Sequence, residues 1–140
     1  MNKLWEEYIY IMLVRSDKIN YTILSQRSKN FWDSKIVKPD IVLIKKSTDE
    51  TYIIDTKWKI IDNNKPSDAD LKQMYVYNMY WDANRSMLLY PTNTNYKEHF
   101  GVFHKGRDGD NLCKLGFINI LNDKGNLDKG IGNLILDKLS

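Results

Sequence analysis

Residues 38–59 read KPDIVLIKKSTDETYIIDTKWK, in which two apolar runs flank a polar segment with turn composition. Runs of β-branched and large apolar residues of this length predict strands, and the whole stretch predicts a β-hairpin. With the turn near residue 48, antiparallel pairing brings Asp40 beside Asp55 and Lys57. Asp55 and Lys57 lie at alternate positions, so their side chains share one face of the strand. The hairpin therefore carries a patch of two carboxylates and one ammonium group.

Such a patch needs a counter-charge, because two carboxylates about 4 Å apart repel by roughly 4 kcal/mol at an effective dielectric near 20. Mg²⁺ takes oxygen ligands and is usually held by one or two carboxylates, with waters and substrate phosphates as the other ligands. It would activate a water and offset charge on phosphorus, while Lys57 orients or deprotonates that water. The alternative is structural: a hairpin on which Lys57 forms a solvated salt bridge with one aspartate.

The spacing of Pro39-Asp40, fourteen further residues and Asp55-Thr56-Lys57 resembles the signature of the PD-(D/E)xK nuclease superfamily. More narrowly, residues 4–91 are similar to the C-terminal nuclease domain of McrC, the cleaving subunit of the McrBC restriction system. This resemblance implies a restriction-endonuclease-like α/β fold, with a central mixed sheet flanked by helices. It also implies Mg²⁺- or Mn²⁺-dependent DNA cleavage with a GTP-driven, McrB-type AAA+ partner that recognises methylated sites. Asp40 and Asp55 would be the metal ligands, and Lys57 the catalytic lysine.

Three further residues enter the candidate site. Gln73 and Tyr77 match a Q-x-x-x-Y element that several families of the superfamily carry, and a spacing of four puts both on one helix face. Trp5-Glu6 resembles the aromatic-Glu pair of the first McrC helix, which makes Glu6 a third candidate acid for the metal and leaves Glu7 in water. The alternatives are that both glutamates only favour a helix N-terminus and that Gln73 and Tyr77 belong to a core helix.

The remaining pattern predicts one domain over residues 1–140. A strand at 86–91, following a helix, is expected to lie parallel to the Asp55 strand in a sheet of about five strands. Residues 25–30 are expected to form a polar, basic loop, and Phe31 and Trp32 to add apolar weight before the hairpin. We expect helices at 2–14, 68–82 and 133–139, and further strands at 19–24, 101–104 and 114–121.

Composition bounds the chemistry. A chain of 140 residues that is 42% hydrophobic can bury a core, and one Cys and two His exclude an internal disulfide and make a zinc site unfavourable. No apolar run approaches membrane-spanning length, so we expect no membrane association and a cytoplasmic location. The net charge of +3 permits polyanion binding. The candidates for contacts with the DNA backbone are Lys59, Lys35, Lys38 and Arg27.

McrC-type proteins normally carry a sizeable region before the nuclease domain. The chain is therefore interpreted as a fragment, a subunit reduced by gene splitting, or a stand-alone nuclease. Two alternatives to the McrC interpretation stay open: a repair or junction-resolving nuclease of the same superfamily, and an inactive DNA-binding or assembly module with the same fold. Cleavage of branched or end-bearing DNA without GTP would favour the repair or junction-resolving nuclease. Absence of divalent-ion binding would favour the inactive module.

Overall fold

The computed structural model describes residues 2–16, 20–59, 61, 65–92, 97–105, 111–119 and 130–140. Within them the chain forms a six-stranded sheet, a separate two-stranded hairpin and three helices. The elements in chain order are α1 (Asn2–Ser16), β1 (Tyr21–Ser25), β2 (Lys29–Trp32), β3 (Lys35–Val37), β4 (Ile41–Lys45), β5 (Thr51–Thr56), α2 (Asp68–Tyr80), β6 (Arg85–Pro91), β7 (Phe100–Val102), β8 (Leu112–Ile118) and α3 (Ile131–Lys138). None of these helices is long and apolar enough to cross a membrane.

The main sheet is mixed, with the strand order β1-β4-β5-β6-β8-β7. Strands β5, β6 and β8 are parallel to one another, whereas β1, β4 and β7 pair with their neighbours in antiparallel fashion. The α/β fold with a central mixed sheet is thus confirmed, and so is the parallel pairing of the 86–91 strand with the Asp55 strand. The sheet has six strands rather than about five, and the strand expected at 114–121 ends at Ile118, with residues 120 and 121 outside the described part.

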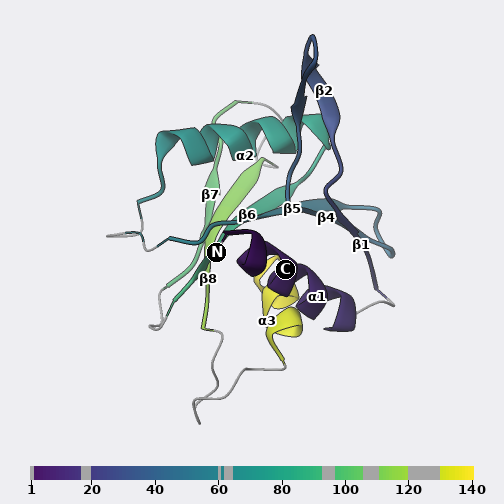
Figure 1. The fold of residues 1–140 in the computed structure, drawn as a ribbon, viewed down its shortest axis with the longest axis vertical. Coiled ribbons are helices and arrows are strands. Elements are labelled where there is room, and N and C mark those ends of the chain that lie inside the picture. Colours follow the sequence, from purple (N-terminus) through teal and green to yellow (C-terminus); the bar gives the residue numbers. More distant parts are fainter. Residues whose placement is uncertain are drawn as a thin grey trace.

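Helices cover both faces of the sheet, with α2 on one side and α1 and α3 on the other (Figure 1). The pleat of β5 divides its side chains between these layers: Tyr52 and Ile54 join the core beneath α1 and α3, and Ile53 joins the core beneath α2. Asp55, two positions after Ile53, is therefore directed to the α2 side. The alternation of side chains along β5 that places apolar residues in both cores therefore also places the Asp55 carboxylate on the α2 side.

Helices α1 and α3 approach each other closely at Gly132. A Cβ placed on Gly132 would meet the Met12 carbonyl oxygen and would lie 2.6 Å from the Ser16 Cβ, so this contact tolerates no side chain. Both helices lie over the sheet face opposite α2 (Figure 1). The close contact secures the N-terminal helix, which carries Glu6, against the sheet.

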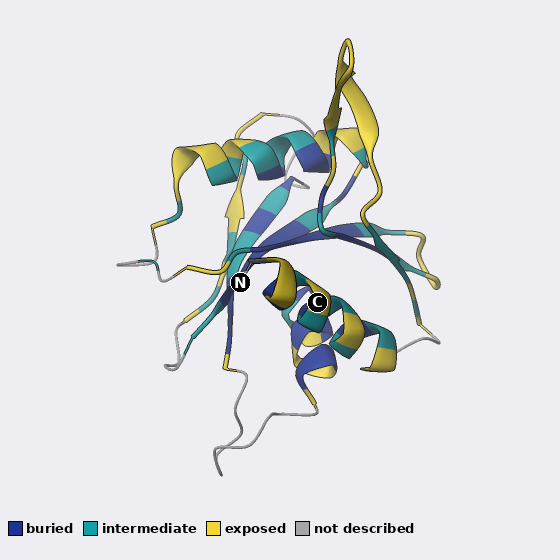
Figure 2. Cartoon of the chain, viewed as in Figure 1, coloured by how far each residue is buried: buried dark blue, intermediate teal, exposed yellow. Residues whose placement is uncertain are grey.

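The loop expected at residues 25–30 is in part a strand, because β2 begins at Lys29. Strands β2 and β3 pair as a hairpin that stands away from the main sheet, with Asp33 at φ 46° in its turn. Every residue of β2 is exposed (Figure 2). Phe31 and Trp32, the two apolar residues expected before the β4–β5 hairpin, are 50% and 65% exposed and lie outside the core. The prediction missed the hairpin because a strand with no buried face shows no apolar alternation.

Candidate active site

The two central aspartates meet where the hairpin of β4 and β5 opens. Asp40 directly precedes β4 and Asp55 is the next-to-last residue of β5, and the pairing of Ile41 with Ile54 sets them side by side. The backbone N–H of Asp40 donates to the Asp55 Oδ1 over 3.4 Å. The predicted neighbourhood of Asp40 and Asp55 is therefore present, whereas their role as metal ligands stays a prediction.

Thr56 fixes the Asp40 side chain. The backbone N–H and the hydroxyl of Thr56 both donate to Asp40 Oδ2, each over 2.8 Å. One carboxylate oxygen of Asp40 is thereby held in place at the cavity that both aspartates line. A carboxylate held by donors from the opposite strand needs no rearrangement before it binds a cation.

Asp55 is buried, with 4% of its surface exposed. Burial first, and the Asp40 charge second, raise the pKa of Asp55 to about 7, against the opposing effect of Lys57. The Lys57 Nζ lies 2.9 Å from Asp55 Oδ2, so the strand face predicted from the sequence does bring these two side chains together. A cation beside this carboxyl group would favour its charged form.

Lys57 is held by three side-chain oxygens. Besides Asp55, its Nζ lies 3.5 Å from Asp70 Oδ1 and donates to Gln73 Oε1 over 3.1 Å. Burial lowers the pKa of Lys57, but the carboxylates of Asp55 and Asp70 outweigh it, and the net shift is upward. Lys57 is therefore an ammonium ion near neutral pH, which suits it to orient a water or neutralise a phosphate better than to remove a proton.

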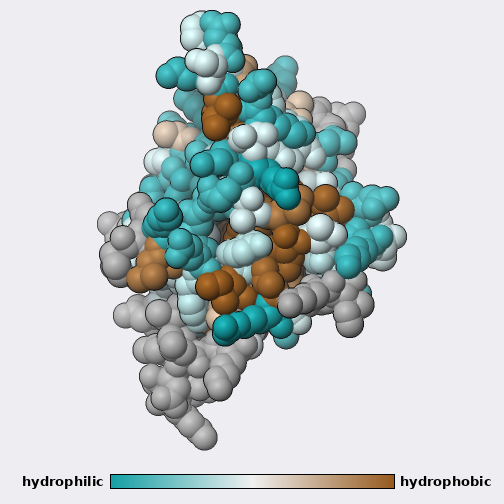
Figure 3. Space-filling model, turned by 45° about the vertical axis from the view of Figure 1, so that its right-hand side comes forward, coloured by the Kyte–Doolittle hydropathy of each residue, from teal (hydrophilic) through white to brown (hydrophobic). Residues whose placement is uncertain are grey.

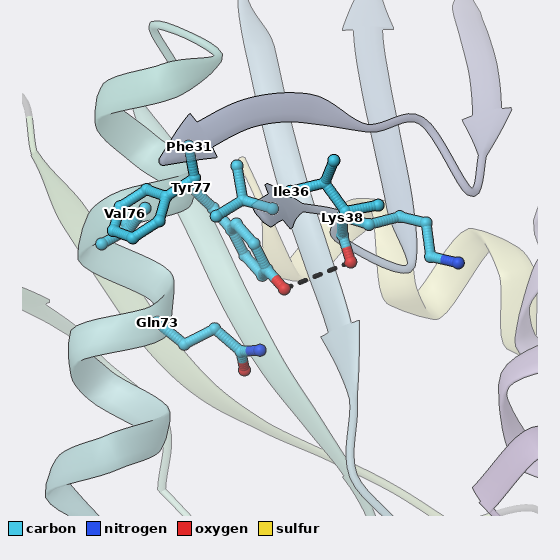
Figure 4. A pocket seen from close by; sticks show the side chains of 7 residues that line it. Phe31, Ile36, Lys38, Gln73, Val76 and Tyr77 are labelled. Atoms are coloured by element: carbon cyan, nitrogen blue, oxygen red, sulfur yellow. Dashed lines mark hydrogen bonds between the residues drawn. The ribbon is translucent and has the colours of Figure 1, made fainter. Parts of the chain in front are cut away.

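Helix α2 supplies Asp70, Gln73 and Tyr77 from one face, because the three residues are spaced by three and four positions. Ser67 caps the helix by accepting a hydrogen bond of 3.0 Å from the Asp70 N–H. The buried Tyr77 donates its hydroxyl to the Lys38 carbonyl oxygen over 3.2 Å, which ties α2 to the segment leading into Asp40 (Figure 4). Tyr77 therefore supports the site through the backbone, as a positioning residue.

Glu6 reaches the same cavity from α1, while the neighbouring Glu7 is exposed. The role of Glu6 as a metal ligand stays a prediction. Burial and the nearby Asp40 charge raise the pKa of Glu6. The Gln26 side-chain amide donates to Glu6 Oε1, and the Gln26 backbone has φ 55° in the left-handed region. A non-glycine residue held in that conformation beside a carboxylate cluster is typical of functional sites.

The four basic candidates separate into two groups. Lys38 and Lys59 line the carboxylate cavity, and Lys59 also forms an ion pair of 2.6 Å with Asp70. Lys35, on β3, and Arg27, in the segment before β2, are exposed and lie outside that cavity. For all four basic residues, contact with the DNA backbone stays a prediction.

The cavity has a volume of about 390 Å³ and is mostly polar. Four carboxylates and three ammonium groups line it: Glu6, Asp40, Asp55, Asp70, Lys38, Lys57 and Lys59. Among the residues that the structure describes, no three acidic, His or Cys side chains converge tightly enough to enclose a metal alone. Two adjacent carboxylates nevertheless fit Mg²⁺, which usually retains several waters and takes only one or two carboxylate ligands.

The family model described as "McrBC 5-methylcytosine restriction system component" matches residues 1–91, which include every site residue named above. The chain belongs to this McrBC family. It also matches a chain in a solved assembly of Thermococcus gammatolerans McrB AAA+ hexamers with bound McrC, with a TM-score of 0.69 and 22% identity. That match covers 100% of this chain and 33% of the other chain, so this chain spans about a third of the length of the chain that it matches. No curated protein matches the chain.

Three residues of this candidate site were not found from the sequence. Asp70 was missed because an acidic residue in the first turn of a helix is expected for helix stability alone, although its spacing of three from Gln73 was a usable signal. Thr56 was treated as the variable position of the D-x-K pattern. Gln26 was assigned only to the polar, basic loop expected at residues 25–30, and no sequence signal indicated its hydrogen bond to Glu6.

Proposed function

We propose that this chain is the DNA-cleaving part of an McrBC-type, modification-dependent restriction system, a Mg²⁺-dependent endonuclease of the PD-(D/E)xK superfamily. The observation that carries the proposal is the convergence of Asp40, Asp55 and Lys57 at one strand end, in a chain of the McrBC family. The D-x-K spacing and the polar cavity around it suit a phosphodiester substrate. Cys113 is buried and does not line the cavity, so it is not placed to act as a nucleophile there.

In this proposal Asp40 and Asp55 hold the metal, with Glu6 beside them as a third acid. A bound Mg²⁺ supplies positive charge that acidifies water and offsets the negative charge that develops on the phosphate. Thr56 keeps Asp40 in position, and Gln73 and Asp70 keep the Lys57 ammonium at the cavity. Lys57 orients the attacking water and neutralises a phosphate oxygen, and Tyr77 holds the Lys38 carbonyl and thus the approach to Asp40.

The partner is proposed on the same basis. The solved assembly that the chain matches is described as McrB AAA+ hexamers with bound McrC. We infer that this chain acts with an McrB-type, GTP-dependent AAA+ subunit, which selects methylated DNA.

The test is cleavage of supercoiled plasmid, methylated or unmethylated, in Mg²⁺ or Mn²⁺, with and without an McrB-type subunit and GTP. We expect the wild-type chain to cleave and Asp55→Ala to abolish cleavage while the folded state is retained, because the substitution removes a repelling charge. Circular dichroism verifies folding. Cleavage that persists in Asp55→Ala, or loss of the folded state in that variant, contradicts the proposed metal-ligand role.

A further inference from the structure

The hairpin of β2 and β3 exposes large apolar side chains without a core of its own. Phe31, Trp32 and Ile36 are 50%, 65% and 53% exposed, and Figure 3 shows hydrophobic surface on this projecting element among hydrophilic side chains. A two-stranded hairpin is at best marginally stable alone. Apolar surface concentrated on such an element indicates a binding role.

Contacts with the C-terminal end of α2 fix the position of the β2–β3 hairpin. Lys29 Nζ donates to the Tyr80 carbonyl oxygen over 2.7 Å and lies 5.0 Å above the Trp81 ring. The rings of Phe31 and Tyr80 are 5.8 Å apart between centroids. These contacts hold β2 against the helix that also carries Gln73 and Tyr77.

Between the hairpin and α2 lies a second cavity, of about 400 Å³. Phe31 and Ile36 line it from the hairpin and Val76 from the helix, and it shares Lys38, Gln73 and Tyr77 with the carboxylate cavity (Figure 4). Its volume lies within the roughly 300–1,000 Å³ usual for ligand pockets. The two cavities therefore adjoin, one apolar and one polar.

The charge around the apolar cavity indicates its ligand. Arg27, Lys35 and Lys38 are exposed on or beside the hairpin, against one acidic residue, Asp33, in its turn. Basic residues that follow a backbone next to aromatic side chains that stack on bases are typical of proteins that bind unpaired nucleic acid strands. An apolar pocket that adjoins a proposed phosphate site suits the base attached to that backbone.

We propose that the pocket formed by Phe31, Ile36, Val76 and Tyr77 accepts an unstacked nucleobase of the strand that the carboxylate cavity holds. The inference rests on the proposed function, because it takes the neighbouring cavity as the phosphate site. The Phe31 ring is the stacking surface, and the Lys38 and Gln73 side chains, shared by both cavities, contact the nucleotide between base and scissile phosphate.

The test compares two single-stranded oligonucleotides of equal length and phosphate count, one with bases and one abasic throughout. Binding is measured in Mg²⁺ on an Asp55→Asn background, on which no cleavage is expected. The chain should prefer the strand with bases, and Phe31→Ala should remove about a 5-fold to 150-fold preference, the range for stacking of one base. Trp32→Ala is the matched control, since Trp32 lies on the same strand outside the pocket and should leave the preference in place.

A second variant guards against misfolding of the hairpin. Val76→Trp fills the pocket from α2 without removing a hairpin side chain, and should abolish the preference as Phe31→Ala does. An unchanged preference in both variants overturns the inference and leaves the pocket for a protein segment. An equal loss in Trp32→Ala also overturns it, because the hairpin would then contact DNA without the pocket. If neither strand binds and plasmid is not cleaved, the proposed function fails together with the inference. Plasmid cleavage without any preference for the strand with bases refutes the inference alone.

Discussion

At the scale of single residues, Asp55 links the site to the stability of the chain. Its pKa is raised to about 7 in the folded state, above the ordinary 3.8, so between these values the folded chain holds a proton that the unfolded chain has lost. The free energy of unfolding therefore decreases as pH rises from about 4 to 7, by at most about 4 kcal/mol, and then levels off. The upward shift of the Lys57 pKa acts only above its ordinary value of 10.5, outside this window.

We predict that metal-free wild-type protein loses stability from pH 4 to 7 and that Asp55→Asn removes most of this slope, because the amide does not titrate. Urea unfolding at several pH values, followed by circular dichroism, measures both. Asp40→Asn should reduce the slope as well, since the Asp40 charge contributes to the raised pKa. An equally steep slope in Asp55→Asn would assign the effect to another group.

Glu6 and Glu7 form a natural pair for comparison. They are adjacent on α1, but only Glu6 lines the carboxylate cavity, while Glu7 is exposed. Glu6→Gln should decrease the cleavage rate by roughly tenfold or more, the usual cost of losing a residue that orients a metal site, and Glu7→Gln should leave it unchanged. Rates of plasmid cleavage at saturating Mg²⁺ decide this. Equal effects of the two substitutions would show that Glu6 contributes no more to cleavage than an exposed residue of the same helix, since neither glutamate lies in the first turn of α1.

At the scale of elements, the packing of α1 on α3 depends on Gly132. Alanine favours helix over glycine by about 1 kcal/mol, yet here a Cβ would meet the Met12 carbonyl and the Ser16 side chain. We expect the clash to prevail, so that Gly132→Ala destabilises the chain by about 1–3 kcal/mol in urea unfolding. Gly101→Ala is the control, since its Cβ would lie at an ordinary 3.5 Å from the Cys113 carbonyl oxygen. Stabilisation by Gly132→Ala would show that the helices separate easily.

The two hairpins show which elements could be predicted from the sequence and which could not. The β4–β5 hairpin and the position of Asp40 beside Asp55 were predictable, because apolar runs and a polar turn set the register. The β2–β3 hairpin was not, since contacts of Lys29 and Phe31 with the end of α2 replace a buried face. Asp70 and Gln26 escaped detection because tertiary contacts with Lys57 and Glu6, far away in sequence, give them their place. The local sequence pattern thus predicted β4, β5 and the carboxylates at their ends. It did not predict Asp70 and Gln26, which contact Lys57 and Glu6 in the folded chain.

At the scale of the whole molecule, metal binding and folding should be linked. A cation that binds only the folded chain stabilises it by about 2.7 kcal/mol at a hundredfold excess over Kd. Below pH 7 the ion must displace the proton of Asp55, so the stabilisation should be larger at pH 8 than at pH 5.5. The raised pKa of Glu6 adds to this difference in the same direction.

We therefore predict that Mg²⁺ raises the Tm of the wild-type chain by several degrees at pH 8 and by much less at pH 5.5, compared with KCl of equal ionic strength. Asp40→Asn and Asp55→Asn should each lose the increase at pH 8, because one carboxylate of the pair is then missing. Lys45→Gln is the control, since it removes a charge at the far end of β4. A Tm increase that both aspartate variants retain would place the ion elsewhere, because the energy that offsets carboxylate repulsion can be gained only where the two carboxylates meet.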